Sequence, residues 1–295
     1  MLQVHGKLED EMNDSINPLI SVLMTSFNRG QYIAEAIESV LASTYMNFEL
    51  IIVDDCSSDN TLNIARSYEM VDKRIKVYQN PINLSQFGNR NKAASYAKGE
   101  FLKYVDSDDI IYPYTLRMMV DGMLQFPKSD LGFCLTTGTC KKPFPYQLDS
   151  KEAYKQHFFE GAPIFVGPSG LIIKRKAFEA VDGFEEFGMP SDNHLTLKIA
   201  AQSPVVAMPR DLFWWRQHVG QVFQQNKKNY YNILNNYNYV RDILINYSPL
   251  SKKENNKLLF NYKKRFAFHI FNLLIKFKLA MLYRILSNLK RWPKK

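Results

Sequence analysis

Short apolar runs alternate with helical patterns along the first half of the chain, and this alternation constrains the fold most strongly. Residues 18–24 (PLISVLM) and 48–54 (FELIIVD) are continuous apolar runs, and residues 33–41 between them carry apolar side chains at helical spacing. The same order continues through runs at 74–80 and 101–105. Strands that alternate with helices are typical of βαβ units, whose strands pair in parallel. The sequence therefore predicts an α/β fold.

Capping and stop signals place several helix ends. Ser58 or Asp59 can cap the helix that follows the second apolar run. Gly99 follows a helical pattern over 85–98 and stands where a helix C-terminal glycine belongs. A further helix is predicted over 113–126, because one proline stands at its start and another follows its end.

Each of the first four predicted strands ends in a polar residue. In open α/β sheets, ligands bind beyond the carboxyl ends of the strands. These ends should therefore line one crevice: Thr25, Asp54, Asn80 and Asp106.

Two of the strand ends carry clustered carboxylates. Asp54 and Asp55 follow the second apolar run, whereas Asp106, Asp108 and Asp109 follow the fourth. An Asp-x-Asp pair beside a substrate phosphate requires a cation, because like charges repel strongly in a partly dry cleft. Mn²⁺ or Mg²⁺, bound by one or two carboxylates and a diphosphate, meets this need and acts as a Lewis acid. The alternative is a surface loop in which the acidic pattern arose by chance.

Composition indicates a globular protein of the cytoplasm. A chain of 295 residues with 46% hydrophobic content can bury a full core. Residues 1–17 are polar and mixed in charge, so no signal peptide is expected. Cys56, Cys134 and Cys140 show no CxxC spacing, which fits free thiols in a reducing compartment.

Positive charge is concentrated at the C-terminus. Residues 251–295 contain 13 Lys and Arg and one Glu, a net charge of +12, so the rest carries −3 of the total of +9. Such a basic tail is typical of attachment to an anionic surface. Residues 266–291 place polar and charged side chains along one helical stripe, which suits the interface of an anionic bilayer. The alternative is a helix that packs on the preceding domain. We expect no nucleic-acid partner, because no nucleic-acid-binding module accompanies the positive charge.

Four blocks of the sequence resemble the family 2 inverting glycosyltransferases, in the same order. They are residues 18–61, 83–109 with its Arg-Asn pair and Asp-x-Asp, 181–200, and 214–221 with an Arg-x-His-x-x-Gln pattern. The resemblance implies a bacterial polysaccharide-type enzyme with the GT-A fold, a Rossmann-like mixed sheet flanked by helices and followed by a helical extension.

The resemblance also divides the chain into parts. Residues 1–17 would form an N-terminal tail, 18–225 the GT-A glycosyltransferase domain, and 226–295 a basic helical C-terminal extension. Within the domain, residues 18–110 would be the nucleotide-binding half and residues 111–225 the acceptor half.

Nucleotide-binding roles follow from the resemblance, position by position. Thr25, Phe27 and Asn28 would form the first edge of the nucleotide pocket. Asp54 or Asp55 would accept hydrogen bonds from the base or the ribose.

Further positions would contact the ribose, the diphosphate and the metal. Arg90 would contact the nucleotide, Asp106 the ribose or the metal, and Asp108 the metal itself. Arg216 and His218 would meet the diphosphate and the metal, although His218 could instead be a packed histidine. The implied cofactor is Mn²⁺ or Mg²⁺.

Asp192 would be the general base of the reaction. The sequence departs from the family pattern beside it, because Ser191 replaces the Glu of a Glu-Asp pair. Cys56 stands where glycine is common in the nucleotide loop, and a tight left-handed turn there would disfavour it. Lys92 also replaces a common glycine.

The resulting prediction is a metal-dependent inverting glycosyltransferase. It would move a sugar from a nucleotide-diphospho-sugar donor, a UDP-sugar by resemblance, to a hydroxyl of a glycan or lipid-linked glycan acceptor. Its basic C-terminal helices would hold it peripherally on the inner face of the cell membrane. One alternative is a non-catalytic sugar-nucleotide-binding protein. The other is a receiver-type signalling module beginning near residue 48, which would leave residues 18–24 unexplained.

Overall fold

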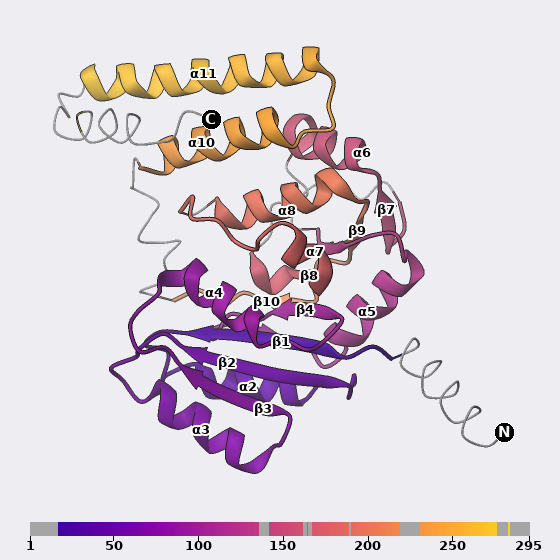
Figure 1. The fold of residues 1–295 in the computed structure, drawn as a ribbon, viewed down its shortest axis with the longest axis vertical. Coiled ribbons are helices and arrows are strands. Elements are labelled where there is room, and N and C mark those ends of the chain that lie inside the picture. The colour runs from indigo at the N-terminus through magenta and orange to yellow at the C-terminus, as the bar shows by residue number, and fades with distance from the viewer. Residues whose placement is uncertain are drawn as a thin grey trace.

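The computed structural model describes residues 17–135, 142–161, 164, 167–188, 190–218, 231–275 and 283 of the chain. Within these residues, an eight-stranded sheet lies at the centre of the molecule in the order β3-β2-β1-β4-β8-β6-β9-β7 (Figure 1). Its first four strands are mutually parallel where they pair, as the βαβ pattern predicts: β1 (Ile20–Ser26), β2 (Phe48–Asp54), β3 (Ile75–Gln79) and β4 (Phe101–Tyr104).

The second part of the sheet is mixed in direction. Strand β8 (Leu171–Lys174) pairs antiparallel with both β4 and β6 (Leu131–Cys134). Strand β9 (Val205–Met208) then pairs parallel with β6, and β7 (Tyr146–Leu148) antiparallel with β9. The expected mixed α/β sheet is confirmed, and β8 joins its two parts. A receiver-type module starting near residue 48 is excluded, because β1 lies between β2 and β4.

The sheet packs helices on both faces because its strands alternate their side chains. Val22 and Met24 of β1 belong to one buried cluster, whereas Leu23 belongs to the other. The first cluster includes residues of α2 (Ile33–Leu41), α3 (Thr61–Val71) and α5 (Thr115–Gln125). The second includes residues of α4 (Ser85–Ser95), α6 (Ser150–Lys155), α7 (Arg175–Ala180) and α8 (Ser191–Gln202).

Two predicted helix ends differ from the structure. Helix α4 ends at Ser95, and Gly99 lies beyond it. A Cβ on Gly99 would stand 2.5 Å from the Ser21 nitrogen, so glycine is required by close approach to β1 rather than by a helix cap. The N-cap position of α3 is Asn60, while the Asp59 carboxylate accepts a hydrogen bond from the Thr61 nitrogen at 3.0 Å.

Two short helices and a small second sheet complete the domain. The helices are η1 (Gln156–Gly161) and η2 (Pro168–Gly170). Strand β10 (Phe213–Trp214) pairs antiparallel with β5 (Ile110–Ile111). This pairing brings residues 215–218 beside the acidic segment that follows β4.

The C-terminal extension contains α10 (Tyr231–Asn246) and α11 (Lys252–Ile275), which lie along one end of the molecule (Figure 1). Tyr239, Val240 and Ile243 of α10 share the buried cluster that contains α8. Helix α10 is therefore part of the core. No helix among the described residues combines the length and the apolar content needed to cross a membrane. The predicted stripe over 266–291 lies largely outside the described residues, which end α11 at Ile275.

Candidate active site

A buried arginine joins the two parts of the sheet at the carboxyl ends of the strands. The Arg90 guanidinium on α4 lies 2.9 Å from the Asp106 carboxylate after β4, and 2.9 Å from the Asp192 carboxylate on α8. Its side chain is only 2% exposed, and the rings of Phe87 and Phe184 flank it at 5.5 and 5.7 Å. One cation therefore balances two carboxylates that are distant in sequence, and a charge-assisted pair of this kind fixes both.

Asp192 combines burial with a raised pKa. It lies in the first turn of α8, and 18% of its side chain is exposed. Burial raises the pKa of Asp192 to about 6, against the lowering effect of Arg90, and Asp106 adds to the rise. A carboxylate with this pKa is ionised at neutral pH yet can hold a proton. Ser191 accepts a hydrogen bond from the Phe187 nitrogen at 2.8 Å and so anchors the turn before α8.

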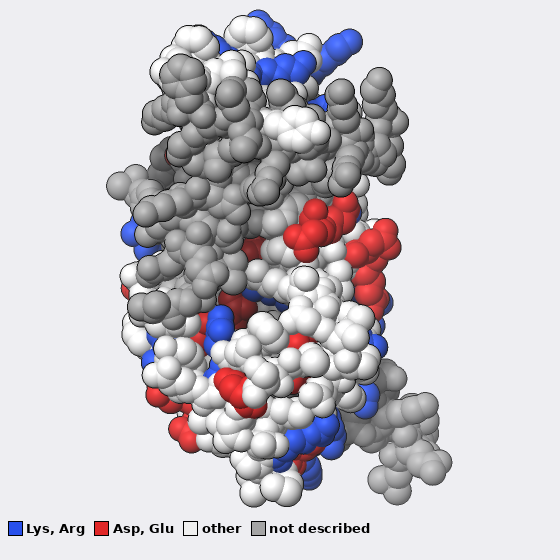
Figure 2. Space-filling model, turned by 90° about the vertical axis from the view of Figure 1, so that its left-hand side faces the viewer, with Lys and Arg blue, Asp and Glu red and all other residues white. Residues whose placement is uncertain are grey.

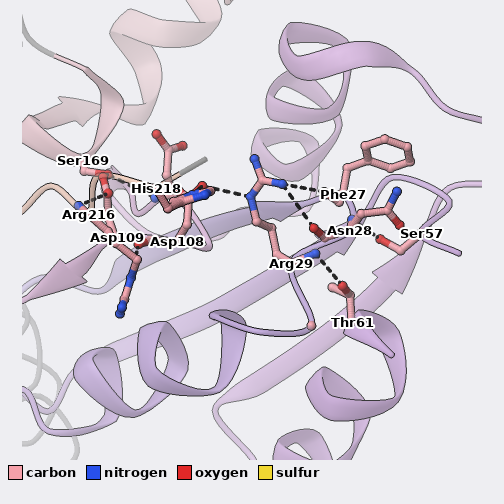
Figure 3. Close-up of polar contacts among 12 residues, drawn as sticks. Phe27, Asn28, Arg29, Ser57, Thr61, Asp108, Asp109, Ser169, Arg216 and His218 are labelled. Atoms are coloured by element: carbon pink, nitrogen blue, oxygen red, sulfur yellow. Dashed lines mark hydrogen bonds and ion pairs between the residues drawn. The ribbon is translucent and has the colours of Figure 1, made fainter. Parts of the chain in front are cut away.

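The Asp108 carboxylate lies between the side chains of Arg29 and His218. Its Oδ2 is 2.9 Å from Arg29 Nε and 3.0 Å from His218 Nε2. Arg29 also donates to the carbonyls of Phe27 at 3.2 Å and Asn28 at 3.1 Å. Figure 3 shows the Arg29 guanidinium between these carbonyls and the acidic segment. Arg29 therefore connects the loop after β1 to Asp108.

Asp109 is the most deeply enclosed member of the acidic segment. Its carboxylate accepts hydrogen bonds from Ser169 Oγ at 2.7 Å and from the Arg216 nitrogen at 3.2 Å (Figure 3). Burial, with Asp106 and Asp108 nearby, raises the pKa of Asp109 to about 7. Ser169 Oγ also accepts a bond from the Asp106 nitrogen at 3.1 Å, so this hydroxyl ties η2 to the acidic segment.

Arg216 is held over the same segment by several contacts. Its Nε donates to the Asp108 carbonyl at 3.0 Å, and its Nη2 lies 2.6 Å from the Glu35 carboxylate. Its guanidinium also lies 5.2 Å from the Tyr32 ring centre and 4.9 Å from that of Trp214. These contacts follow from the pairing of β10 with β5.

Asp54 and Asp55, at the end of β2, are both buried, and both accept hydrogen bonds from neighbouring loops. Asp54 accepts from the Ser57 nitrogen at 2.9 Å, and Asp55 accepts from Asn80 Nδ2 and the Leu84 nitrogen at 2.8 Å each. Both carboxylates therefore shape the loops after β2 and β3, and their contact with a base or ribose stays a prediction.

The loop after β1 is linked to the loop after β2. The Asn28 nitrogen donates to Ser57 Oγ at 2.9 Å, and Asn28 Oδ1 accepts from the Ser58 nitrogen at 2.9 Å. Phe27 is exposed beside them, and Thr25 is half-buried near the end of β1. Cys56 adopts the left-handed region with a φ of 66°, where a side chain costs about 1–3 kcal/mol. The strain anticipated at this glycine-like position is present.

The structure thus brings together most of the predicted site. The Arg90 ion pairs and the β10–β5 pairing gather six predicted residues at the junction of the two parts of the sheet: Arg90, Asp106, Asp108, Asp192, Arg216 and His218. Their roles stay predictions. Sequence reasoning missed Arg29 and Ser169. Arg29 directly follows a predicted pocket residue, whereas nothing in the spacing indicated Ser169. Gln221 of the last block lies outside the described residues.

The predicted metal ligands supply suitable atoms in part. Asp106, Asp108 and His218 offer carboxylate oxygens and an imidazole nitrogen, which suit Mn²⁺, while Mg²⁺ prefers the oxygens. Among the described residues, no group of three or more His, Cys, Asp or Glu side chains is arranged to hold a metal ion. Mg²⁺ commonly takes only one or two carboxylates and completes its shell with substrate phosphates and water. Binding of a metal together with a diphosphate by these side chains stays a prediction.

A hollow crosses the middle of one face of the molecule, and charged side chains of both signs lie within it (Figure 2). Two solved structures show the same fold. Staphylococcus aureus TarS in complex with UDP-GlcNAc matches with a TM-score of 0.66 at 23% identity, over 83% of this chain and 72% of that one. The mannosyltransferase PcManGT from Pyrobaculum calidifontis, in complex with GDP-Man and Mn²⁺, matches with a TM-score of 0.60 at 15% identity, over 95% and 77%. The expected GT-A fold is confirmed.

The family follows from sequence similarity. The profile of glycosyl transferase family 2 matches residues 21–181, which is more than half of the chain, and the chain belongs to that family. It is 42% identical over 92 residues to the teichuronic acid biosynthesis glycosyltransferase TuaG of Bacillus subtilis, covering 31% of this chain and 36% of TuaG. It is 42% identical over 107 residues to the Escherichia coli glucosyltransferase WfgD, covering 36% and 42%. The chain thus spans less than half the length of these two relatives; GlyG of Streptococcus pneumoniae matches at 27% over 71% of this chain and 74% of GlyG.

Proposed function

We propose that this protein is a metal-dependent inverting glycosyltransferase. It transfers a sugar from a nucleotide-diphospho-sugar to a hydroxyl of a glycan or lipid-linked glycan. The observation that carries the proposal is the Arg90 junction, in which one guanidinium holds Asp106 of the nucleotide-binding half and Asp192 of the acceptor half. A transferase needs donor-binding groups and a base held in one fixed arrangement.

Asp192 takes the proton of the acceptor hydroxyl. Its pKa of about 6 leaves it ionised at neutral pH and gives it more basicity than an ordinary aspartate. A positioned base of this kind contributes about 10²- to 10⁴-fold in rate. Attack by the activated hydroxyl from the face opposite the diphosphate inverts the anomeric carbon in a single displacement.

The diphosphate leaving group is stabilised from the other side. Asp108 and His218, with Asp106 nearby, would hold Mn²⁺ or Mg²⁺, which supplies Lewis acidity to the leaving diphosphate when bound. Arg216 supplies a fixed positive charge over the same segment. Electrostatic stabilisation of the leaving group is usually the largest single contribution to such catalysis.

The donor is proposed to be a UDP-sugar. WfgD, whose name describes a UDP-Glc-dependent transferase acting on a diphosphoundecaprenol-linked sugar, supports both the UDP donor and a lipid-linked acceptor. Thr25, Phe27 and Asn28, with Asp54 or Asp55, would bind the nucleoside.

Peripheral contact with the inner face of the cell membrane is part of the proposal. Exposed aromatic residues of α11, Phe260, Phe268 and Phe271, alternate along the helix with lysines such as Lys257 and Lys264. Figure 2 shows Lys and Arg side chains at the end of the molecule where α11 lies. Each basic side chain near an anionic membrane is worth about 1 kcal/mol. Sedimentation with anionic and neutral vesicles, comparing wild type with Phe260→Ser and Phe271→Ser, tests the contact.

A screen of nucleotide sugars tests the proposed function. UDP-, GDP- and dTDP-sugars are each added with Mn²⁺ or with EDTA, and thermal stabilisation and release of nucleoside diphosphate are measured. We expect a UDP-sugar to stabilise the protein and to be turned over only with metal. Binding without any turnover would favour a non-catalytic sugar-nucleotide-binding protein, and turnover unaffected by EDTA would refute the metal dependence.

A further inference from the structure

A hydrogen bond from a buried histidine links the C-terminal extension to the helix that carries Asp192. His194 on α8 is completely buried, and its Nε2 lies 2.8 Å from Asp242 Oδ2 on α10. The two residues are 48 positions apart. Because the partner is a carboxylate, Nε2 is the ring nitrogen that donates. Asp242 Oδ1 accepts from Asn246 Nδ2 at 2.7 Å, which orients the carboxylate towards α8.

Aromatic rings enclose this contact on both sides. The His194 ring lies 4.3 Å from the Phe187 ring and meets Tyr247 edge-on at 6.3 Å. The Phe187 nitrogen donates to Ser191 Oγ, so the ring that packs on His194 belongs to the turn that starts α8. The contact between Asp242 and His194 therefore lies against the turn that leads into Asp192.

The turn before α8 also approaches α10 very closely. A Cβ on Gly188 would stand 2.5 Å from Asn235 Nδ2, and Gly188 has a φ of +69°. The positive φ favours glycine here, and a larger residue would also require the Asn235 amide to move. The backbone that leads into α8 is thus fitted against α10.

Asp192 and His194 point away from each other on α8. A helix turns about 100° per residue, so two side chains two positions apart lie about 200° apart around the axis. One side of the first turn is held by Arg90 through Asp192, and the opposite side by Asp242 through His194. The start of α8 is therefore fixed from two directions.

We propose that Asp242 is a positioning residue, which holds the start of α8 so that the Asp192 carboxylate keeps its place beside Arg90. This inference rests on the proposed function, in which Asp192 is the base. Asp242 belongs to the C-terminal extension, outside the residues matched by the family profile, so the extension completes the site. Catalytic groups must be held within about 0.5 Å of their productive geometry, and a misplacement of about 1 Å can cost about 10²-fold in rate.

The test compares three substitutions in the full chain. Asp242→Ala removes the contact, whereas Asp242→Asn keeps an oxygen that can accept from His194. Glu254→Gln is the matched control, because Glu254 lies on α11 and pairs with Lys155 rather than with a residue of α8. We expect Asp242→Ala to lower kcat by about 10- to 100-fold. Its KM for the donor and its Kd for UDP should stay within about twofold of wild type, because the proposed nucleoside-binding residues lie in or directly after β1 and β2 rather than on α8 or α10. Asp242→Asn should restore kcat to within about threefold, and Glu254→Gln should match wild type.

The outcomes separate this inference from the proposed function. If Asp192→Asn loses transfer but Asp242→Ala keeps the wild-type kcat, the positioning role is wrong and the proposed function stands. If Asp192→Asn keeps full turnover, the base assignment fails, and the positioning role fails with it. Thermal unfolding shows whether Asp242→Ala folds; if it does not, the milder Asp242→Ser, whose hydroxyl cannot span the gap to His194, gives the same comparison.

Discussion

Arg90 is expected to contribute strongly to the stability of the fold, and Arg90→Met tests this. The substitution keeps much of the apolar stem but removes the cation between Asp106 and Asp192. Breaking a buried ion pair by removing one partner costs about 3–5 kcal/mol. Asp106 is 32% exposed and Asp192 18%, so solvent screens part of the loss and the lower value, about 3 kcal/mol, applies.

The effect of Arg90→Met should depend on pH. Arg90 lowers the pKa of Asp192, which burial raises to about 6, so without Arg90 that pKa rises further. Above that raised pKa the variant must keep the Asp192 carboxylate buried without its cation, whereas at lower pH the Asp192 carboxyl is neutral. The loss of stability is therefore largest near pH 8 and diminishes towards pH 5.

Urea unfolding at pH 5 and pH 8 measures this difference. In thermal unfolding at pH 8, the same loss of about 3 kcal/mol should lower the Tm by about 6–12 °C, at 2–4 °C per kcal/mol for a domain of this size. Arg66→Met on α3 is the control, because the Arg66 side chain is 47% exposed and its pair with Glu69 should be worth less than about 1 kcal/mol. An Arg90→Met variant as stable as the control at pH 8, or equally destabilised at both pH values, would refute the reasoning.

Three further outcomes follow from the site and the sheet. The rate of transfer at saturating donor should fall about tenfold per pH unit below about pH 6, because the Asp192 carboxylate must be ionised to accept a proton; a pH–rate profile that is flat from pH 7 to 4.5 would contradict this. Ser169→Ala should cost about 1–3 kcal/mol in urea unfolding, because it leaves the buried Asp109 carboxylate without its 2.7 Å hydrogen bond; an unchanged midpoint would show that the bond contributes little. Gly99→Ala should destabilise by about 1–3 kcal/mol, since its Cβ would stand 2.5 Å from the Ser21 nitrogen, whereas Gly167→Ala, whose Cβ would meet nothing within 4 Å, serves as the control.

The sequence predicts the first part of the sheet well because local pattern determines it. Apolar runs separated by helical spacing specify β1 to β4 with little help from distant contacts. Gly99 shows the limit of local reasoning, because its requirement comes from the approach of Ser21, 78 residues away. Nothing in the residues around Gly99 reveals that neighbour.

The site residues also separate into those that the sequence indicates and those that only the structure shows. Asp106 and Asp108 are visible at a strand end, and the resemblance to family 2 enzymes leads to Asp192, Arg216 and His218. Contacts between distant segments are not visible in a single sequence. The Arg29 bond to Asp108 spans 79 positions and the His194 contact with Asp242 spans 48, and neither has a motif.

Transfer by Asp192→Asn tests the account most directly. The variant and wild type are compared for sugar transfer and for UDP binding with Mn²⁺, with Asp121→Asn, an exposed change on α5, as the control. The amide keeps the shape of the side chain and can still contact Arg90, but it cannot take a proton. The account predicts that Asp192→Asn loses about 10²- to 10⁴-fold in kcat while its Kd for UDP stays within about threefold of wild type. Full turnover by Asp192→Asn would contradict the assignment of Asp192 as the base.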